Sequence, residues 1–286
     1  MTAAPMTISH DGLDDEQQSR LVATLASLPM TFRPAKAGRP GDVVAVGGPD
    51  WALRTDRAAA AGARGILLLD PWPLEHPALR EVAAVRRPVV VDTGWRHNPA
   101  VDTVRDGVAR YRRPGALLEV RSAVRPGEDL VRAAVGPLDL VTAVAGGLAG
   151  LEVLRHDARH LVLGGELADG GDVLLTVLTT RARPRSTSLT VAGDDGRAEL
   201  ALPDPGTAAP GVAALVGPAG RTVLPHVSES ARRGALRCLA AAVETDAAPD
   251  DLPRLLDAAA LLAAAIEEGR RSVPGAQPTH DTTGVL

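Results

Sequence analysis

The sequence predicts an α/β protein in two parts: an N-terminal domain built on a parallel sheet, and an α+β C-terminal domain with an open, mainly antiparallel sheet. In the first part, two apolar runs at residues 43–46 and 66–69 flank an Ala-rich segment. Runs without polar alternation are typical of strands buried on both faces, so this stretch predicts a βαβ unit. In the second part, short strand patterns follow one another with turns between them, which favours antiparallel pairing.

Composition narrows the class of protein. At 286 residues with 45% hydrophobic content, the chain can bury one or two sizeable cores. A net charge of -4 gives no general attraction to polyphosphate, and the apolar stretches end well short of the ~20 residues of a membrane span. We expect a cytoplasmic protein with no nucleic-acid or membrane partner. The single cysteine, Cys238, permits no disulfide within the chain, and no metal site is expected.

Local signals place the elements of the N-terminal domain. Leucines at helical spacing between Asp14 and Pro29 predict a helix that the proline ends. The apolar runs are broken by Gly-Gly-Pro at 47–49 and by Asp-Pro at 70–71, so these residues lie at the carboxyl ends of strands. The expected elements are strand 6–9, helix 14–28, strand 30–33, strand 43–46, an Ala-rich helix, strand 66–69, helix 77–85, strand 88–91 and helix 99–110.

The residues Tyr-Arg-Arg-Pro-Gly at 111–115 mark a domain boundary. We expect an N-terminal domain at 6–112, a C-terminal domain at 115–271 and a flexible tail at 272–286. A segment rich in Pro, Gly and Ala at 204–220 is expected to be a loop, and Arg232 and Arg233 to lie on a solvated helix face. The expected C-terminal elements are strand 117–124, helix 128–144, strands 151–154, 160–163, 173–180, 188–192 and 197–202, and helices 228–244 and 251–269.

Three segments occur in a recognisable order. Residues 42–50 read Asp-Val-Val-Ala-Val-Gly-Gly-Pro-Asp, an Ala-rich segment leads to Gly62 and on to Asp70-Pro71, and residues 96–100 read Arg-His-Asn-Pro-Ala. In order and spacing the chain resembles the Gfo/Idh/MocA-like oxidoreductases, whose members read D-A-V-V-I-A-T-P-N, then G-K-H-V-L-C-E-K-P, then R-F-x-P-A. The resemblance implies a Rossmann-like, dinucleotide-binding N-terminal domain and a C-terminal sheet whose exposed face builds the subunit interface.

The turn after the first strand departs from this family. A dinucleotide-binding domain carries G-x-G-x-x-G there, and its glycines let backbone N–H groups reach a pyrophosphate. Residues 10–16 instead read His-Asp-Gly-Leu-Asp-Asp-Glu. The carboxylates stabilise a helix N-terminus and repel a pyrophosphate. Only residues 34–41 separate the second strand from the next, so the Rossmann-like domain is trimmed as well as degenerate.

We therefore expect no cofactor. If NAD(P) does bind, the candidate contacts are Gly12, Gly48, Pro49 and Pro71.

The catalytic positions that the resemblance implies have also changed. Matching Pro71 to the E-K-P segment puts Asp70 at the position of the family's catalytic lysine. Matching residues 138–140 puts Gly136 at its catalytic histidine and Arg132 at the partner aspartate. The remaining cleft candidates are Asp70, Arg96 and His97. Asp70 acts as a base if desolvation raises its pKa, or else caps the following turn; His97 binds or donates, or else packs at a helix start.

Three functions stay open. The first is a non-catalytic or accessory partner subunit, associated as a homo-oligomer or with a related oxidoreductase through the C-terminal sheet. The second is an active NAD(P)-dependent oxidoreductase acting on a small polar or sugar-like substrate with a rearranged site. The third is a cofactor-free lyase, isomerase or binding protein that uses the same cleft. For the first, alternation in strand 173–180 puts Leu175 on one face and Leu178 on the other, so both faces carry apolar side chains.

Overall fold

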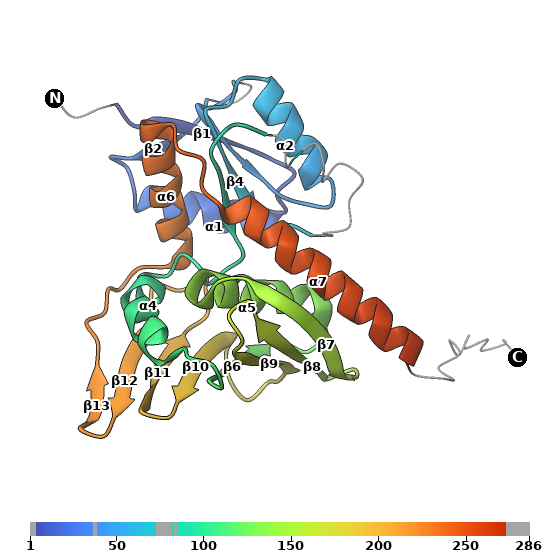
Figure 1. The fold of residues 1–286 in the computed structure, drawn as a ribbon. Coiled ribbons are helices and arrows are strands. Elements are labelled where there is room, and N and C mark those ends of the chain that lie inside the picture. Colours follow the sequence, from blue (N-terminus) through green and yellow to red (C-terminus); the bar gives the residue numbers. More distant parts are fainter. Residues whose placement is uncertain (1–3, 37–38, 73–81, 83–84, 273–286) are drawn as a thin grey trace, which may run out of the picture.

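The computed structural model describes residues 4–36, 39–72, 82 and 85–272, which form two sheets with helices between and around them (Figure 1). The first sheet is entirely parallel and has the strand order β2-β1-β3-β4-β5. Its strands are β1 (Met6–Asp11), β2 (Phe32–Pro34), β3 (Val43–Val46), β4 (Gly65–Leu69) and β5 (Val89–Asp92). The prediction of a parallel N-terminal sheet is therefore confirmed.

Both faces of this sheet are covered, which explains its continuous apolar strands. All five residues of β4 are buried. One face packs on α1 (Asp15–Ala26) and α6 (Ala231–Thr245), and the other on α2 (Trp51–Ala60) and the start of α7 (Asp251–Ser272). The short link from β2 to β3 leaves β2 as an edge strand beside β1, so the sheet has the trimmed form that the sequence predicts.

The second sheet has eight strands in the order β13-β12-β11-β10-β6-β9-β8-β7. Among the described strands of this sheet only β6 and β9 pair in parallel, so the prediction of a mainly antiparallel sheet is also confirmed. The strands are β6 (Leu117–Val124), β7 (Leu148–His156), β8 (His160–Leu167), β9 (Asp172–Thr179), β10 (Ser186–Gly193), β11 (Gly196–Leu202), β12 (Val212–Gly217) and β13 (Gly220–Val223).

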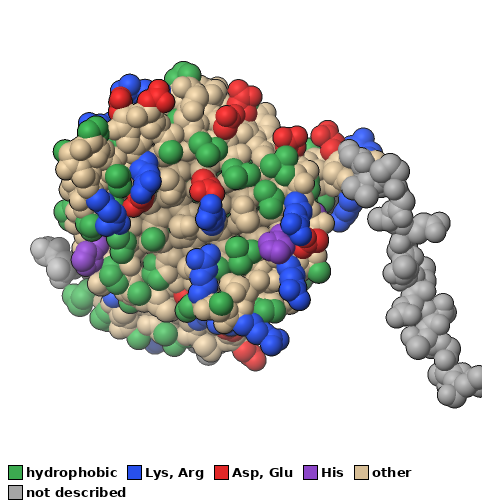
Figure 2. Space-filling view, turned by 90° about the horizontal axis from the view of Figure 1, so that it is seen from below, with side chains coloured by type: hydrophobic (Ala, Val, Ile, Leu, Met, Phe, Trp, Pro, Cys, Tyr) green, Lys and Arg blue, Asp and Glu red, His purple; other side chains and the backbone are tan. Residues whose placement is uncertain are grey.

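Helices cover one face of the second sheet. α4 (Pro99–Tyr111), α5 (Leu130–Ala145) and α7 pack there, between the two sheets (Figure 1). The opposite face is visible from below, where apolar side chains are interspersed with arginines and carboxylates (Figure 2). On β9, Leu175 is fully buried under the helices and Leu178 is half-buried on the outer face, as the alternation predicts.

Packing does not follow the expected division at residues 112–115. The sequence places α4 before the boundary, but this helix packs on β10, β11 and β12 of the second sheet. It places α6 after the boundary, but this helix packs on β4 and β5 of the first sheet. The expected loop at 204–220 is also wrong in part, because β12 lies within it and pairs with β11. The expected tail from residue 273 onward and most of the expected helix 77–85 lie outside the described residues.

Within the described ranges, no helix combines the length and apolar character needed to cross a membrane. The same residues contain no group of three or more His, Cys, Asp or Glu side chains arranged to hold a metal ion.

Candidate functional site

A cleft of about 570 Å³ lies where the two halves of the molecule meet. Its walls are the first turn of α1, the residues after β4 and β5, the N-terminal part of α5, and the loops around Arg185 and Asp204. The carboxyl ends of parallel strands are the usual location of sites in such sheets. Asp70, Pro71, Arg132 and Gly136 all line this cleft, so residues that were matched separately to the family's catalytic segments share one cavity.

Asp70 follows β4 in an unusual conformation. Its φ of +46° lies in the left-handed region, which costs a residue with a Cβ ~1 kcal/mol. Its backbone N–H donates to the carbonyl of Asp92 at 3.0 Å, which fixes the turn against β5. Burial, and then the nearby carboxylate of Asp92, raise the pKa of Asp70, although Arg232, Arg185 and Arg132 oppose the shift. Asp70 is therefore easier to protonate than an ordinary aspartate.

Arg232 joins Asp70 to Asp92. The Arg232 guanidinium donates from Nε to Asp92 Oδ2 at 2.8 Å, and its Nη2 lies 3.9 Å from Asp70 Oδ2. Asp92 also accepts from the backbone N–H of Gly94 at 3.1 Å. The prediction that Arg232 lies on a solvated face is wrong, because its side chain is only 11% exposed and faces the cleft.

The floor of the cleft is tightly packed beside Gly136. A Cβ at this position would lie 2.7 Å from the carbonyl oxygen of Thr93 and 3.1 Å from ring carbons of Trp95. α5 thus approaches the loop after β5 closely enough to exclude a side chain. Arg132, one turn earlier on α5, is exposed to the cleft, and Arg185 lies over the Trp95 ring at 5.0 Å.

The turn after β1 is closed rather than open. A Cβ on Gly12 would lie 2.6 Å from both Gly47 O and Arg54 Nε, and a Cβ on Gly48 would lie 2.6 Å from Gly12 O. Arg54 also forms an ion pair with Asp11. Two of the candidate cofactor contacts, Gly12 and Gly48, therefore form a contact between two loops.

The remaining two candidate cofactor contacts differ in exposure, and of the two only Pro71 lines the cleft. Pro49 is exposed, whereas Pro71 is buried in the cleft wall.

The first turn of α1 satisfies its own backbone donors. Asp14 Oδ1 accepts from Gln17 N at 2.7 Å, and Gln17 Oε1 accepts from Asp14 N at 3.2 Å, which together form a capping box. Asp15 and Glu16 add two further negative charges to the same turn. The carboxylates therefore do what the sequence predicts at a helix start, and Asp14 and Glu16 also line the cleft.

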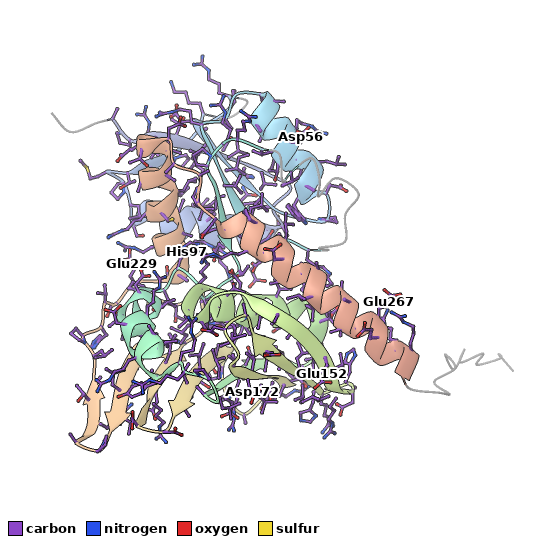
Figure 3. All side chains as sticks on the ribbon, in the orientation of Figure 1. Asp56, His97, Glu152, Asp172, Glu229 and Glu267 are labelled. Atoms are coloured by element: carbon purple, nitrogen blue, oxygen red, sulfur yellow. The ribbon has the colours of Figure 1, made fainter. Side chains whose placement is uncertain are left out.

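Arg96 and His97 lie beside a different cavity, of about 1050 Å³, which α4, α5, α6 and α7 border. His97 lies at the junction between the two halves of the molecule (Figure 3). Its Nε2 is 3.0 Å from both Val91 O and Asp251 Oδ2. Burial lowers the pKa of His97, but the hydrogen bond and charge of Asp251 outweigh it and raise that pKa overall. His97 is thus part of a packed interdomain contact rather than the cleft that contains Asp70.

Arg96 joins the same contact. Its Nη1 is 3.1 Å from Asp139 Oδ1 on α5, and its Nη2 is 2.8 Å from Asp251 Oδ1 at the start of α7. Burial raises the pKa of Asp139, and Arg96 and a hydrogen bond from Thr93 oppose this. Burial also acts to raise the pKa of Asp251, but His97 and Arg96 outweigh it, so that pKa is lowered.

Several of these residues were not identified from the sequence. Asp92 ends a buried strand as Asp70 does, so the same strand-end rule could have found it. Arg185, Arg232 and Asp251 lie far from either strand end in the sequence, and no local pattern distinguishes them from other surface charges.

The sequence matches no protein-family model and no curated protein. Solved structures do match the fold. KijD10, a 3-ketoreductase from Actinomadura kijaniata in complex with TDP-benzene and NADP, gives a TM-score of 0.72 at 18% identity, covering 93% of this chain and 98% of that chain. The UDP-N-acetylglucosamine 3-dehydrogenase GnnA from Acidithiobacillus ferrooxidans gives 0.71 at 13% identity, covering 93% and 99%. The chain shares the fold of these two structures, as its resemblance to the Gfo/Idh/MocA-like oxidoreductases implies.

Proposed function

We propose that this chain is a non-catalytic, accessory subunit that keeps the fold of NAD(P)-dependent sugar oxidoreductases without their hydride transfer. The observation that carries the proposal is the first turn of α1. A pyrophosphate binds at such a turn through free backbone N–H groups and the positive end of the helix dipole. Here the Asp14 carboxylate already accepts from the backbone N–H of Gln17. The negative charges of Asp15 and Glu16 would repel a pyrophosphate. These residues do not fit a dinucleotide in its usual position.

The contact between the loops after β1 and β3 supports the same conclusion. In the dinucleotide-binding fold, the glycines of the first turn leave space for the cofactor backbone. In this chain Gly12 is packed against Gly47, and the Arg54 side chain covers it while pairing with Asp11. A dinucleotide following the usual path would have to displace Arg54 and leave Asp11 without its partner.

The residues at the matched catalytic positions supply no proton relay of the family's kind. Asp70 replaces a cation with a carboxyl group, and Lys36, the single lysine of the chain, does not line the cleft. Gly136 replaces the histidine where no side chain fits, because Thr93 O and the Trp95 ring occupy the space. Restoring the family's residues one at a time would therefore not restore its chemistry.

The outer face of the second sheet suits a subunit contact. No helix of the described residues packs on it, and half-buried or exposed apolar side chains are spread across it, among them Leu117, Leu174, Leu178 and Val212. The ion pair of Arg121 with Glu119 lies on β6 of the same sheet. A mixed surface of this kind is typical of protein–protein interfaces. We propose that it joins two copies of this chain, or this chain to a related oxidoreductase.

A second candidate function uses the cleft itself. Asp70 is a carboxyl group with a raised pKa in a cavity, which is how a general acid or base is prepared. This favours either a cofactor-free lyase, isomerase or binding protein, or an NAD(P)-dependent oxidoreductase with a rearranged site. For the latter, the structural neighbour KijD10 was solved in complex with NADP.

Titration of the purified protein with NADH and NADPH, followed by calorimetry and nicotinamide fluorescence, separates these functions. The proposal expects no saturable binding at micromolar cofactor. The variant with Asp15→Asn and Glu16→Gln keeps the Asp14 cap and removes two charges, so any weak affinity should increase in it. Tight binding of either cofactor to the wild type would refute the non-catalytic role.

A further inference from the structure

The acidic and basic side chains that line the cleft between the two sheets differ in whether they have partners within the chain. Its carboxylates have partners within the chain: Asp14 caps α1, Glu16 pairs with Arg20, Glu128 accepts from Arg125 N, Asp129 caps α5, and Asp204 accepts from Gly206 N. Asp70 lies beside Arg232. The hydrogen-bonding capacity of these carboxylates is therefore largely used within the chain.

Three arginines that line the cleft have no ion-pair partner among the described residues. Arg125, Arg132 and Arg185 line it, and within the described residues none has a carboxylate at ion-pair distance. Arg132 and Arg185 line the same cleft as Asp70, and the positive charge of each acts to lower the pKa of Asp70. Guanidinium groups with free donors that converge in a cavity are typical of carboxylate and phosphate sites.

Arg185 is held in place by aromatic packing. Its guanidinium lies 5.0 Å from the centre of the Trp95 ring, and Trp95 is fully buried with its Nε1 donating to Pro203 O at 3.1 Å. The Nε atom of Arg185 is buried and has no acceptor in the part of the chain that the structure describes. A stacked guanidinium loses little conformational freedom on binding, so it is prepared for a ligand.

The space beside these arginines suits a small molecule. A hollow of about 270 Å³ adjoins the cleft and shares Arg20, Asp70, Arg185 and Arg232 with it. Together the two cavities have the size typical of small-ligand sites. Anion binding is also linked to the protonation of Asp70. An anion held by Arg132 and Arg185 would lie near the Asp70 carboxyl group and favour its protonated form.

We infer that the cleft binds a small anionic molecule through a carboxylate or phosphate group held by Arg132 and Arg185 next to Asp70. This site goes beyond the accessory-subunit role and does not depend on a dinucleotide or on a partner.

Calorimetric titration with inorganic phosphate and, separately, with succinate tests the inference at constant ionic strength, with glucose as the neutral probe. The wild type should bind at least one of the two anions and not glucose. Arg185→Gln and Arg132→Gln should each weaken binding about ten-fold or more, since charged hydrogen bonds are lost. At a pH high enough to ionise Asp70, Asp70→Asn should strengthen binding several-fold, because a neighbouring negative charge is removed.

Arg57→Gln is the matched control. It removes the same charge from an exposed arginine on α2 that does not line the cleft, and it should leave affinity unchanged. Circular dichroism would establish that each variant is folded, and Asp70→Asn provides an effect of opposite sign that misfolding cannot produce. Phosphate alone or succinate alone as the bound probe identifies the source of the anionic group. Binding of neither anion by the wild type, or an equal loss in Arg57→Gln and Arg185→Gln, would overturn the inference.

Discussion

Replacing Arg96 by methionine should destabilise the protein strongly, because it removes the guanidinium that Asp139 and Asp251 share. The three side chains are only 9%, 1% and 4% exposed, and the ion-pair distances are 3.1 and 2.8 Å. Removing one partner of a buried ion pair costs about 3–5 kcal/mol, because the other charge is left without compensation. A domain is typically stable by about 5–15 kcal/mol, so the variant should lose a large share of its free energy of unfolding.

Urea unfolding followed by circular dichroism measures this loss as a change in midpoint at constant slope. Arg254→Met is the control, because Arg254 pairs with Asp250 where the side chains are 37% and 58% exposed, and such pairs contribute about 0–1 kcal/mol. Adding Asp139→Asn to Arg96→Met should recover part of the loss, because it neutralises a stranded charge. Equal destabilisation by Arg96→Met and Arg254→Met would refute the reasoning.

Three further outcomes are expected. The stability advantage of the wild type over His97→Gln should be complete below pH 6.5 and should disappear as pH rises through the folded-state pKa of His97, because folding raises that pKa. Urea titrations at several pH values measure this advantage, and an advantage that grows with pH would contradict the expectation. Leu175→Arg should unfold the protein by burying a charge, whereas Leu178→Arg should leave it folded and dissociate any assembly, as light scattering would detect. Asp70→Lys should restore no NAD(P)-linked dehydrogenase turnover; measurable turnover would show that the lysine was the only missing group.

The first sheet was predictable because its signal is local. The run Gly-Ile-Leu-Leu-Leu of β4 has no polar alternation, and the structure covers both faces of the strand with helices. β12 was missed because Pro, Gly and Ala dominate the surrounding segment. Its apolar run Val-Ala-Ala-Leu-Val becomes a strand by pairing with β11, and such pairing is a tertiary contact that composition does not reveal.

The cleft was predictable only in part. The strand-end rule located Asp70, because the carboxyl ends of parallel strands meet at one edge of a sheet. It could not locate Arg232 or Arg185, which reach the cleft from α6 and from the segment before β10. It also could not show that Arg96 and His97 lie beside a different cavity from Asp70, for a related reason. Their partner Asp251 lies 154 residues after His97 in the sequence, so no local pattern reveals the contact.

The return of α6 to the first sheet has a consequence for the order in which the protein can fold during synthesis. A nascent chain that ends at Tyr111 already contains all five strands of that sheet but lacks α6, so Leu67 and Leu69 on β4 would be without Leu236 and Leu239, which share their core. The N-terminal half should therefore remain open to chaperones and proteases until the last quarter of the chain leaves the ribosome. A fragment cut at the apparent sequence boundary is correspondingly a poor choice for expression, although it looks like a complete parallel-sheet domain.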